Sequence, residues 1–355
     1  MQFSLSRIRG WSVGLCILLI LVATTFSFAS SRAVLAAGEQ QIADLGQCQL
    51  ASGATLENCN VGYRLFGELN DERSNAIIIL TWFTGTVEDY VNFGYIGPGR
   101  FADSSRYFVI AIDALGNGVS SSPTNSLAQA GSGFPDITIG DMVDSQYRLL
   151  TEVLGIEHLH AVIGISMGGM QTFEWVVRYP DFADNAVPVI GTPRQTSYDI
   201  LLWETQLATI EHLADVDYDG AVRVIAGLDA LTRHTPGYVA TVTTPDGYAE
   251  YMTQLLQLTV AFRLENRVPQ LQAMIAHDIT DSFDGSMSLA ATAAEARMLV
   301  IVSPTDHMVN PLPSREFVSL SDAELHELQG DCGHLSVACE KDTLAQVVND
   351  FLLSQ

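Results

Sequence analysis

Residues 161–169 read Ala161-Val162-Ile163-Gly164-Ile165-Ser166-Met167-Gly168-Gly169, an apolar run that breaks into Gly-x-Ser-x-Gly and continues into a helical pattern. This pattern is typical of a nucleophile elbow, in which a serine lies on a sharp turn between a strand and a helix. Glycines flank the serine because a Cβ atom there would clash. The turn exposes the hydroxyl at the mouth of a pocket and directs the next N–H into the same space. Ser166 is therefore predicted to be the nucleophile of an acyl-transfer reaction.

Short apolar runs alternate with longer helical patterns along the rest of the chain, which is typical of a mostly parallel sheet flanked by helices. A helix is expected over residues 139–154, where Thr138 and Asp141 are able to form a capping box. The helix behind the elbow is expected to continue over 171–178 and to end before Pro180. Buried strands are predicted at 76–80, 107–112, 159–165, 186–190, 298–302 and 325–328.

The pattern becomes purely helical between residues 192 and 297, with helices expected at 200–214, 247–264 and 269–277. We interpret residues 192–297 as a helical cap inserted between the sixth and seventh strands of the sheet. The α/β core then comprises residues 37–191 and 298–355. A cap over the strand ends would shape a substrate pocket and limit the entry of water. The alternative is that these helices only enlarge the core.

The first 36 residues form a separate segment. Arg7 and Arg9 precede an apolar run, and Val34-Leu35-Ala36 places small residues at the −3 and −1 positions before Ala37. This order is typical of a secretory signal peptide. The alternative is an uncleaved membrane anchor, because the apolar run is near the lower limit for spanning a bilayer. We expect an exported protein, periplasmic or secreted, that meets a membrane only if this segment is retained.

The chain is strongly acidic, with 41 Asp and Glu residues against 17 Lys and Arg residues and a formal net charge of −24. A field of this sign repels nucleic acid and anionic lipid, so neither is an expected partner. The sequence leaves the oligomeric state open, a homodimer included.

Four cysteines follow the N-terminal segment, and export favours their oxidation. We favour the pairs Cys48–Cys59 and Cys332–Cys339 because the members of each pair are close in sequence. A zinc site is the competing interpretation, but neither pair has the C-x₂₋₄-C spacing of a structural site.

A serine nucleophile needs a base, and the base needs an acid that orients it. In this architecture the chain order is serine, acid, histidine. Asp306 is the best acid, since it follows the predicted strand 298–302, and His334 is the best base, since it follows the strand 325–328. His307 is not expected to be the base, because it directly follows Asp306 and the base must reach Ser166 from a separate element. The remaining histidines are interpreted as surface or packing residues: 158, 160, 212, 234, 277 and 326.

An oxyanion hole needs two preorganised N–H donors. One is expected at Met167, and the other in the loop Thr81-Trp82-Phe83-Thr84-Gly85-Thr86, where we assign Phe83. The alternative is that this loop is an ordinary glycine-containing turn. No dinucleotide fingerprint and no P-loop is present in the sequence, so no cofactor or metal is expected.

Further motifs lie between Gly62 and Arg194. They are Tyr63-Arg64-Leu65-Phe66-Gly67-Glu68-Leu69-Asn70, Phe83-Thr84-Gly85-Thr86, Ile96-Gly97-Pro98-Gly99, Tyr107-Phe108-Val109-Ile110, Leu115-Gly116-Asn117-Gly118, Ile137-Thr138-Ile139-Gly140-Asp141-Met142-Val143 and Gly164-Ile165-Ser166-Met167-Gly168-Gly169-Met170-Gln171. With Asp306 and Gly333-His334, this series resembles the homoserine O-acetyltransferase branch of the α/β-hydrolases. The resemblance implies that fold, an acyl-enzyme on Ser166, His334 as base, Asp306 as its orienting acid, and Phe83 and Met167 as oxyanion donors.

Two positions differ from that branch. Leu335 stands where the acetyltransferases carry an acid that helps to hold the acceptor, and the loop 113–123 is more like that of plain hydrolases. These differences favour water as the acceptor, with a small-molecule acyl ester as the substrate. The competing hypotheses are an O-acyltransferase with a hydroxyl acceptor and a binding protein that keeps the fold without catalysis.

Overall fold

The structure, a computed structural model, describes residues 38–354 of the chain. The predicted signal peptide, residues 1–36, lies outside the described residues. No helix within residues 38–354 combines the length and the apolar character needed to cross a membrane.

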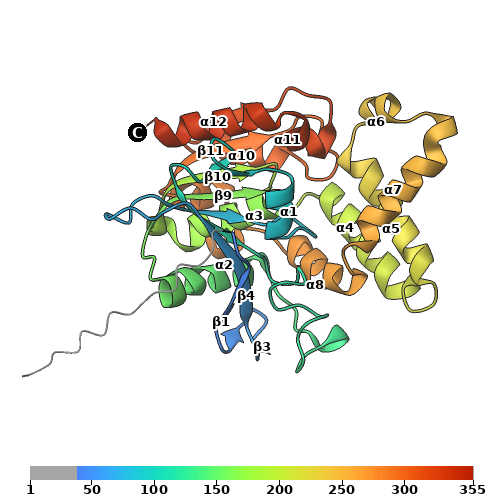
Figure 1. Cartoon of the computed structure of the whole chain (residues 1–355), viewed down its shortest axis with the longest axis horizontal. Helices are drawn as coiled ribbons and strands as arrows, with labels where there is room; N and C mark the ends of the chain where they lie inside the picture. Colours follow the sequence, from blue (N-terminus) through green and yellow to red (C-terminus); the bar gives the residue numbers. More distant parts are fainter. Residues whose placement is uncertain (1–37, 355) are drawn as a thin grey trace, which may run out of the picture. The chain divides into compact units, whose positions relative to one another are not determined.

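An eight-stranded sheet forms the centre of the fold (Figure 1). Its order is β1-β4-β8-β5-β9-β10-β11-β12. The first two pairings are antiparallel, and β8 to β12 run parallel, as expected. The strands are β1 (Gln41–Asp44), β4 (Asn60–Phe66), β5 (Ala76–Leu80), β8 (Phe108–Ile112), β9 (Leu159–Ile165), β10 (Ala183–Val189), β11 (Arg297–Val302) and β12 (Glu324–Glu327).

All six predicted strands are present, with bounds shifted by at most three residues. The predicted burial is wrong for the last of them, because β12 is an edge strand that contains no buried residue. The two antiparallel strands β1 and β4 were not predicted as strands, because Gly62 and Arg64 interrupt the apolar pattern of β4. Four short strands form two further ribbons: β2 (Cys48–Gln49) with β3 (Thr55–Leu56), and β6 (Ile96–Gly97) with β7 (Ala102–Asp103).

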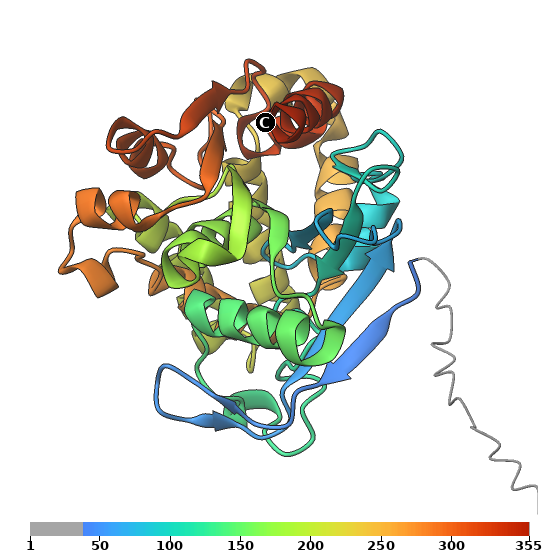
Figure 2. The ribbon, with the colours of Figure 1, turned by 90° about the vertical axis from the view of Figure 1, so that its left-hand side faces the viewer.

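Helices cover both faces of the sheet because successive strand residues point to opposite sides. Ile78 of β5 packs in one core with residues of α2 (Ile139–Arg148) and α3 (Met167–Arg178). Its neighbour Ile77 packs in a second core with residues of α1 (Val87–Asn92) and α12 (Lys341–Leu353). Figure 2 shows α12 in red and α2 in green on opposite sides of the sheet. This three-layer arrangement confirms the predicted fold class.

The predicted helix 139–154 is confirmed, but its second half is wound more loosely. Residues 139–148 form α2, and η2 (Leu149–Leu154) continues it as a π-helix. The capping box between Thr138 and Asp141 is present, and α3 ends at Arg178 as expected. Short helices complete the core: η1 (Gly131–Gly133), η3 (Pro180–Phe182), α10 (Leu312–Ser319), η6 (Gly333–Leu335) and α11 (Ser336–Cys339).

Between β10 and β11, the sixth and seventh strands of the main sheet, the chain forms only helices. They are α4 (Ser197–Leu213), α5 (Tyr218–Arg233), α6 (Pro236–Val242), η4 (Pro245–Gly247), α7 (Tyr248–Val260), α8 (Leu264–Ile275), η5 (Asp281–Phe283) and α9 (Met287–Ala293). In Figure 1, α4 to α7 lie together at one end of the sheet, with α8 next to them. We call residues 192–297 the inserted segment.

Two predicted helix boundaries in the inserted segment are wrong. The helix expected over 247–264 ends as α7 at Val260. Pro269 was expected to begin a helix, but it lies inside α8, which begins at Leu264. Proline inside a helix removes one backbone hydrogen bond. Eight of the twelve α8 residues are buried, so tertiary packing offsets this loss. The helices α5, α6 and α9 were not predicted.

Candidate active site

Ser166 lies between the end of β9 and the first residue of α3, at the point where the chain reverses. Its backbone φ is +58° and its ψ is −119°, a conformation that a residue with a Cβ atom adopts at an energetic cost. The N–H of Ser166 donates to the carbonyl of Val189 on the neighbouring strand, at 2.8 Å. Strand pairing therefore holds the strained residue in place.

The glycines around Ser166 are required by close backbone contacts. A Cβ atom on Gly164 would lie 2.0 Å from the carbonyl oxygen of Gly168, and one on Gly168 would lie 2.1 Å from the carbonyl oxygen of Leu80. No side chain fits at either distance. The motif that defines the elbow in the sequence is thus explained by the tight contact of β9, α3 and β5.

Ser166, His334 and Asp306 form one hydrogen-bond chain. The Oγ of Ser166 is 2.9 Å from Nε2 of His334, and Nδ1 of His334 is 2.7 Å from Oδ2 of Asp306. A carboxylate only accepts, so Nδ1 carries the proton and Nε2 is left as an acceptor for the serine hydroxyl. All three residues are at least nine-tenths buried. The structure therefore brings together three predicted residues that span 168 positions of the chain.

The loop that carries His334 is fixed by several contacts. The hydroxyls of Ser303 and Ser336 both donate to the carbonyl of Gly333, each at 2.8 Å. Gly333 has a φ of +68°, and an added Cβ atom would lie 3.1 Å from the carbonyl oxygen of Arg233. The sulfur atoms of Cys332 and Cys339, on either side of His334, are 1.98 Å apart. The loop of His334 is thus held by the residue that follows β11, by the inserted segment and by contacts of its own.

The loop after β5 leaves one amide free beside the elbow. The N–H groups of Thr84, Gly85 and Thr86 donate to Gln270 Oε1, to the carbonyl of Trp82 and to Asp89 Oδ2, respectively. Of the four amides from Phe83 to Thr86, only that of Phe83 has no partner among residues 38–354. Met167 is the first residue of α3, so its N–H has no acceptor within the helix. Both predicted oxyanion donors are therefore available.

Gln171 joins Thr81, at the start of the loop that carries Phe83, to Met167 and was not predicted as a site residue. Its Nε2 donates to the carbonyls of Thr81 and Met167, at 3.1 and 3.2 Å. Its Oε1 accepts from Nε2 of Gln146. The side-chain oxygen Oε1 of Gln146 accepts in turn from Nε1 of Trp175. The side chain of Gln171 is fully buried. Its place at the end of the motif 164–171, one turn after Met167, is the signal in the sequence that could have found it.

The other histidines lie outside this hydrogen-bond chain. His307 is exposed although it follows Asp306 directly. His277 is buried and binds the carbonyl of Thr192, at 3.0 Å. His234 contacts the carbonyl of Cys332, and His158 pairs with Asp184. Within residues 38–354, no three His, Cys, Asp or Glu side chains are grouped as metal ligands.

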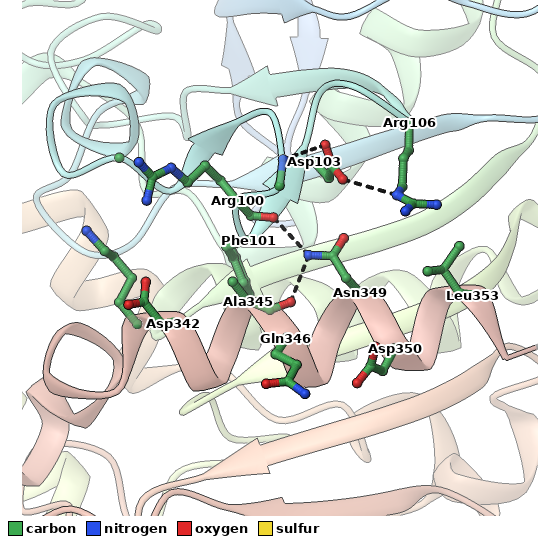
Figure 3. A pocket seen from close by; sticks show the side chains of 13 residues that line it. Arg100, Phe101, Asp103, Arg106, Asp342, Ala345, Gln346, Asn349, Asp350 and Leu353 are labelled. Atoms are coloured by element: carbon green, nitrogen blue, oxygen red, sulfur yellow. Dashed lines mark hydrogen bonds and ion pairs between the residues drawn. The ribbon is translucent and has the colours of Figure 1, made fainter.

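A separate surface pocket of about 440 Å³ lies between residues 94–106 and α12, and no triad residue lines it. Figure 3 shows Asn349 there, with its Nδ2 donating to the carbonyls of Arg100 and Ala345. Three basic and three acidic side chains line this pocket, so it offers no net charge to a ligand.

Residues 77–338 match the family described as the alpha/beta hydrolase fold. The chain is an α/β-hydrolase. It is 41% identical to the ethyl acetate hydrolase of Pseudomonas veronii over 49% of its own length and 50% of that protein, so it spans about half the length of this relative. It is 29% identical to the homoserine O-acetyltransferase of Methanococcoides burtonii over 86% of its own length and 72% of that protein.

A solved structure, an acetylester hydrolase from Corynebacterium glutamicum, superimposes on this α/β-hydrolase with a TM-score of 0.83. The two chains are 27% identical, and the match covers 89% of this chain and 96% of the other. The expected resemblance to the homoserine acetyltransferase branch is confirmed. The similar proteins of this α/β-hydrolase thus include two named as hydrolases of acetic esters and one named as an acyltransferase.

Proposed function

We propose that this α/β-hydrolase is an exported esterase that hydrolyses small acyl esters through an acyl-Ser166 intermediate. The observation that carries the proposal is the buried hydrogen-bond chain from Ser166 through His334 to Asp306. It lies beside two amides that are free to bind a negatively charged oxygen, those of Phe83 and Met167.

In the first half-reaction, the Oγ of Ser166 attacks the ester carbonyl carbon while Nε2 of His334 takes the hydroxyl proton. The carbonyl oxygen becomes negatively charged and accepts hydrogen bonds from the N–H groups of Phe83 and Met167. The carbon–oxygen bond to the alcohol then breaks. The leaving alkoxide takes the proton from His334 and departs as the alcohol, which leaves an acyl group on Ser166.

In the second half-reaction, a water molecule attacks the acyl carbon and gives a proton to Nε2 of His334. The bond to Oγ breaks, Ser166 recovers its proton from His334, and the carboxylic acid leaves. Asp306 keeps the imidazole in the required tautomer and stabilises the imidazolium that forms in both halves.

Two observations support a small acyl group and water as the acceptor. Two similar proteins, the ethyl acetate hydrolase and the acetylester hydrolase, have names that specify acetic esters. Leu335 places an apolar side chain directly after the base, where the acetyltransferase branch carries an acid. In this proposal residues 192–297 act as a cap that limits the access of bulk water to Ser166. Ser166 is only 7% exposed.

Two observations support export. Cys48 and Cys59 form a disulfide bond, with their sulfur atoms 2.04 Å apart. Cys332 and Cys339 form a second one. Disulfides persist in oxidising compartments. Residues 1–36 have the order of a signal peptide, whose removal would release the chain into the periplasm or the medium.

The second candidate function is O-acyl transfer to a hydroxyl acceptor. The similarity to a homoserine O-acetyltransferase, which extends over 86% of this chain, favours it. Both functions use the same acyl-enzyme, so they differ only in the acceptor that resolves it.

The test is the time course of p-nitrophenol release from p-nitrophenyl acetate by residues 37–355, with Ser166→Ala as the blank. We expect sustained turnover that the variant loses. A burst of about one equivalent followed by silence would support a specific hydroxyl acceptor instead. Turnover that Ser166→Ala retains, or a wild-type chain that is not labelled by a fluorophosphonate, would overturn the proposed function.

A further inference from the structure

Helix α8 of the inserted segment reaches the loop that carries Phe83. The side chain of Gln270 is fully buried, and its Oε1 accepts from the N–H of Thr84, at 3.0 Å. Its Nε2 donates to the carbonyl of Leu115, in the loop after β8, at 3.2 Å. One side chain of the inserted segment thus joins two loops that follow neighbouring parallel strands of the core.

The chemistry of these two contacts requires an amide. Thr84 offers a donor, and Leu115 offers an acceptor, so the side chain between them must accept at one atom and donate at the other. A carboxylate would leave the Leu115 carbonyl without a donor, and an apolar side chain would leave both backbone groups unpaired. Buried backbone groups without partners are costly, so both loops favour the observed position of Gln270.

The contact falls at a strained point of the loop. Thr84 has a φ of +64°, in the region that favours glycine. Its N–H belongs to the peptide group that follows Phe83, so a hydrogen bond at this atom sets the orientation of the backbone next to the candidate donor. Non-glycine residues keep such conformations only where surrounding contacts hold them.

The side chain of Phe83 is held by the inserted segment as well. The guanidinium of Arg267, also on α8, lies over the Phe83 ring with its Cζ 5.4 Å from the ring centre. Trp203 of α4 contacts the same ring edge to face, at 5.8 Å between centres. Arg267 is itself fixed by Asp229, at 3.1 Å. Backbone and side chain of the loop are therefore both fixed from residues 192–297.

We propose that Gln270 is a positioning residue for the oxyanion hole, and that the inserted segment thereby sets the geometry of one of its two donors. The inference rests on the proposed acyl-transfer function. Because the negative charge on the carbonyl oxygen develops only in the transition state, a misplaced Phe83 amide lowers kcat and leaves KM nearly unchanged.

The test compares two buried amide side chains on the same helix. Gln270→Met keeps the length of the side chain and removes the amide. The control is Asn266→Leu. Asn266 is also buried and accepts from the N–H and hydroxyl of Thr124, at 3.2 and 2.9 Å, but within residues 38–354 its side-chain hydrogen bonds do not reach the Phe83 loop. Each variant loses two hydrogen bonds between α8 and the core loops, and only Gln270→Met loses the contact to the loop that carries Phe83.

We expect Gln270→Met to lower kcat for p-nitrophenyl acetate about 10- to 100-fold, which is less than the loss of an oxyanion donor itself. Its KM should stay within about twofold of wild type. The inhibition constant of a methyl trifluoromethyl ketone, whose adduct with Ser166 carries an oxyanion, should rise by the same factor as kcat falls. Asn266→Leu should leave kcat and this inhibition constant within about threefold of wild type.

Wild-type kcat and inhibition in Gln270→Met, or equal losses in both variants, would overturn the inference, since equal losses mean that only the docking of α8 matters. Thermal unfolding of each variant shows whether it is folded. If Gln270→Met does not fold, Gln270→Asn replaces it, because an amide that is one methylene shorter cannot bridge both loops. Absence of Ser166-dependent turnover in the wild-type chain would instead mean that the proposed function is wrong.

Discussion

Asp306 uses its two carboxylate oxygens for different partners. Oδ2 accepts from His334 Nδ1, whereas Oδ1 accepts from the N–H groups of Met308 and Val309, at 2.8 and 3.0 Å. The two backbone donors fix the plane of the carboxylate, and the plane in turn aims Oδ2 at the imidazole. In the proposed mechanism, backbone amides of its own loop thus orient Asp306, and Asp306 in turn orients the imidazole of His334.

This arrangement predicts the effect of Asp306→Asn. The amide oxygen of the new side chain will face the two backbone donors, and its NH₂ group will face His334. The imidazole must then accept at Nδ1 and carry its proton on Nε2, where it is unable to take the proton of Ser166. We expect kcat to fall about 10³- to 10⁴-fold with little change in thermal stability. Steady-state kinetics with Ser166→Ala as the floor will measure it, and a loss below tenfold would contradict the assigned role.

At the level of elements, the segment between β12 and α12 carries the base and is held by one of the two cysteine pairs. The pairs close loops of similar size, with sequence separations of 11 and 7. Cys48–Cys59 joins the β2–β3 ribbon to the start of β4, whereas Cys332–Cys339 encloses His334. Loop-closure entropy gives about 2–3 kcal/mol for either bond. Their contributions to stability are thus similar, and only their positions differ.

The double variants Cys48→Ala/Cys59→Ala and Cys332→Ala/Cys339→Ala separate stability from activity. We expect similar decreases in melting temperature for both, because the closed loops are similar. Only Cys332→Ala/Cys339→Ala should lower kcat, because the loss of that bond frees the loop that places Nε2 of His334. Calorimetry and esterase kinetics on the same samples test this. If Cys48→Ala/Cys59→Ala lowers kcat as strongly as Cys332→Ala/Cys339→Ala does, the bond around His334 has no special role in activity.

At the scale of the whole molecule, buried histidines make stability depend on pH. Burial lowers the pKa of His277, and it acts in the same direction on His160 and His234. The unfolded chain takes up protons at these positions below a pH of about 6.5, while the folded chain resists them. The unfolded state then binds more protons than the folded state. The contribution of these histidines to the free energy of unfolding is therefore complete above that pH and decreases as the pH falls.

Urea unfolding at pH 8, 6 and 5 tests this dependence, with His277→Gln as the comparison. A glutamine amide is able to donate to the Thr192 carbonyl, but it does not titrate. We expect wild-type stability to decrease toward pH 5 and the variant to decrease less steeply, since it lacks the most deeply buried of the three groups. Parallel curves for the two proteins would show that His277 does not contribute.

Local pattern was sufficient for most of the fold and for the candidate triad. The elbow is recognisable because its glycines, its apolar strand and its helix are contiguous in residues 161–178. Asp306 follows the buried strand β11 and His334 follows the edge strand β12, and the ends of parallel strands meet at one edge of a sheet. The strand β4 was not predicted because glycine and arginine interrupt its apolar alternation, and β1 was not predicted because its four residues are too few to show a period.

The amino-acid sequence determined the chemistry that the chain can carry: the strained serine, its acid and base in order, and the apolar runs that build a parallel sheet. Only the tertiary structure decided which side chains hold these groups in place. Gln270 meets Thr84 across 186 residues, and Gln171 joins Thr81 to Met167. A buried glutamine on a helix has the same local pattern whatever it faces, because periodicity reports that a residue is buried and not against which partner.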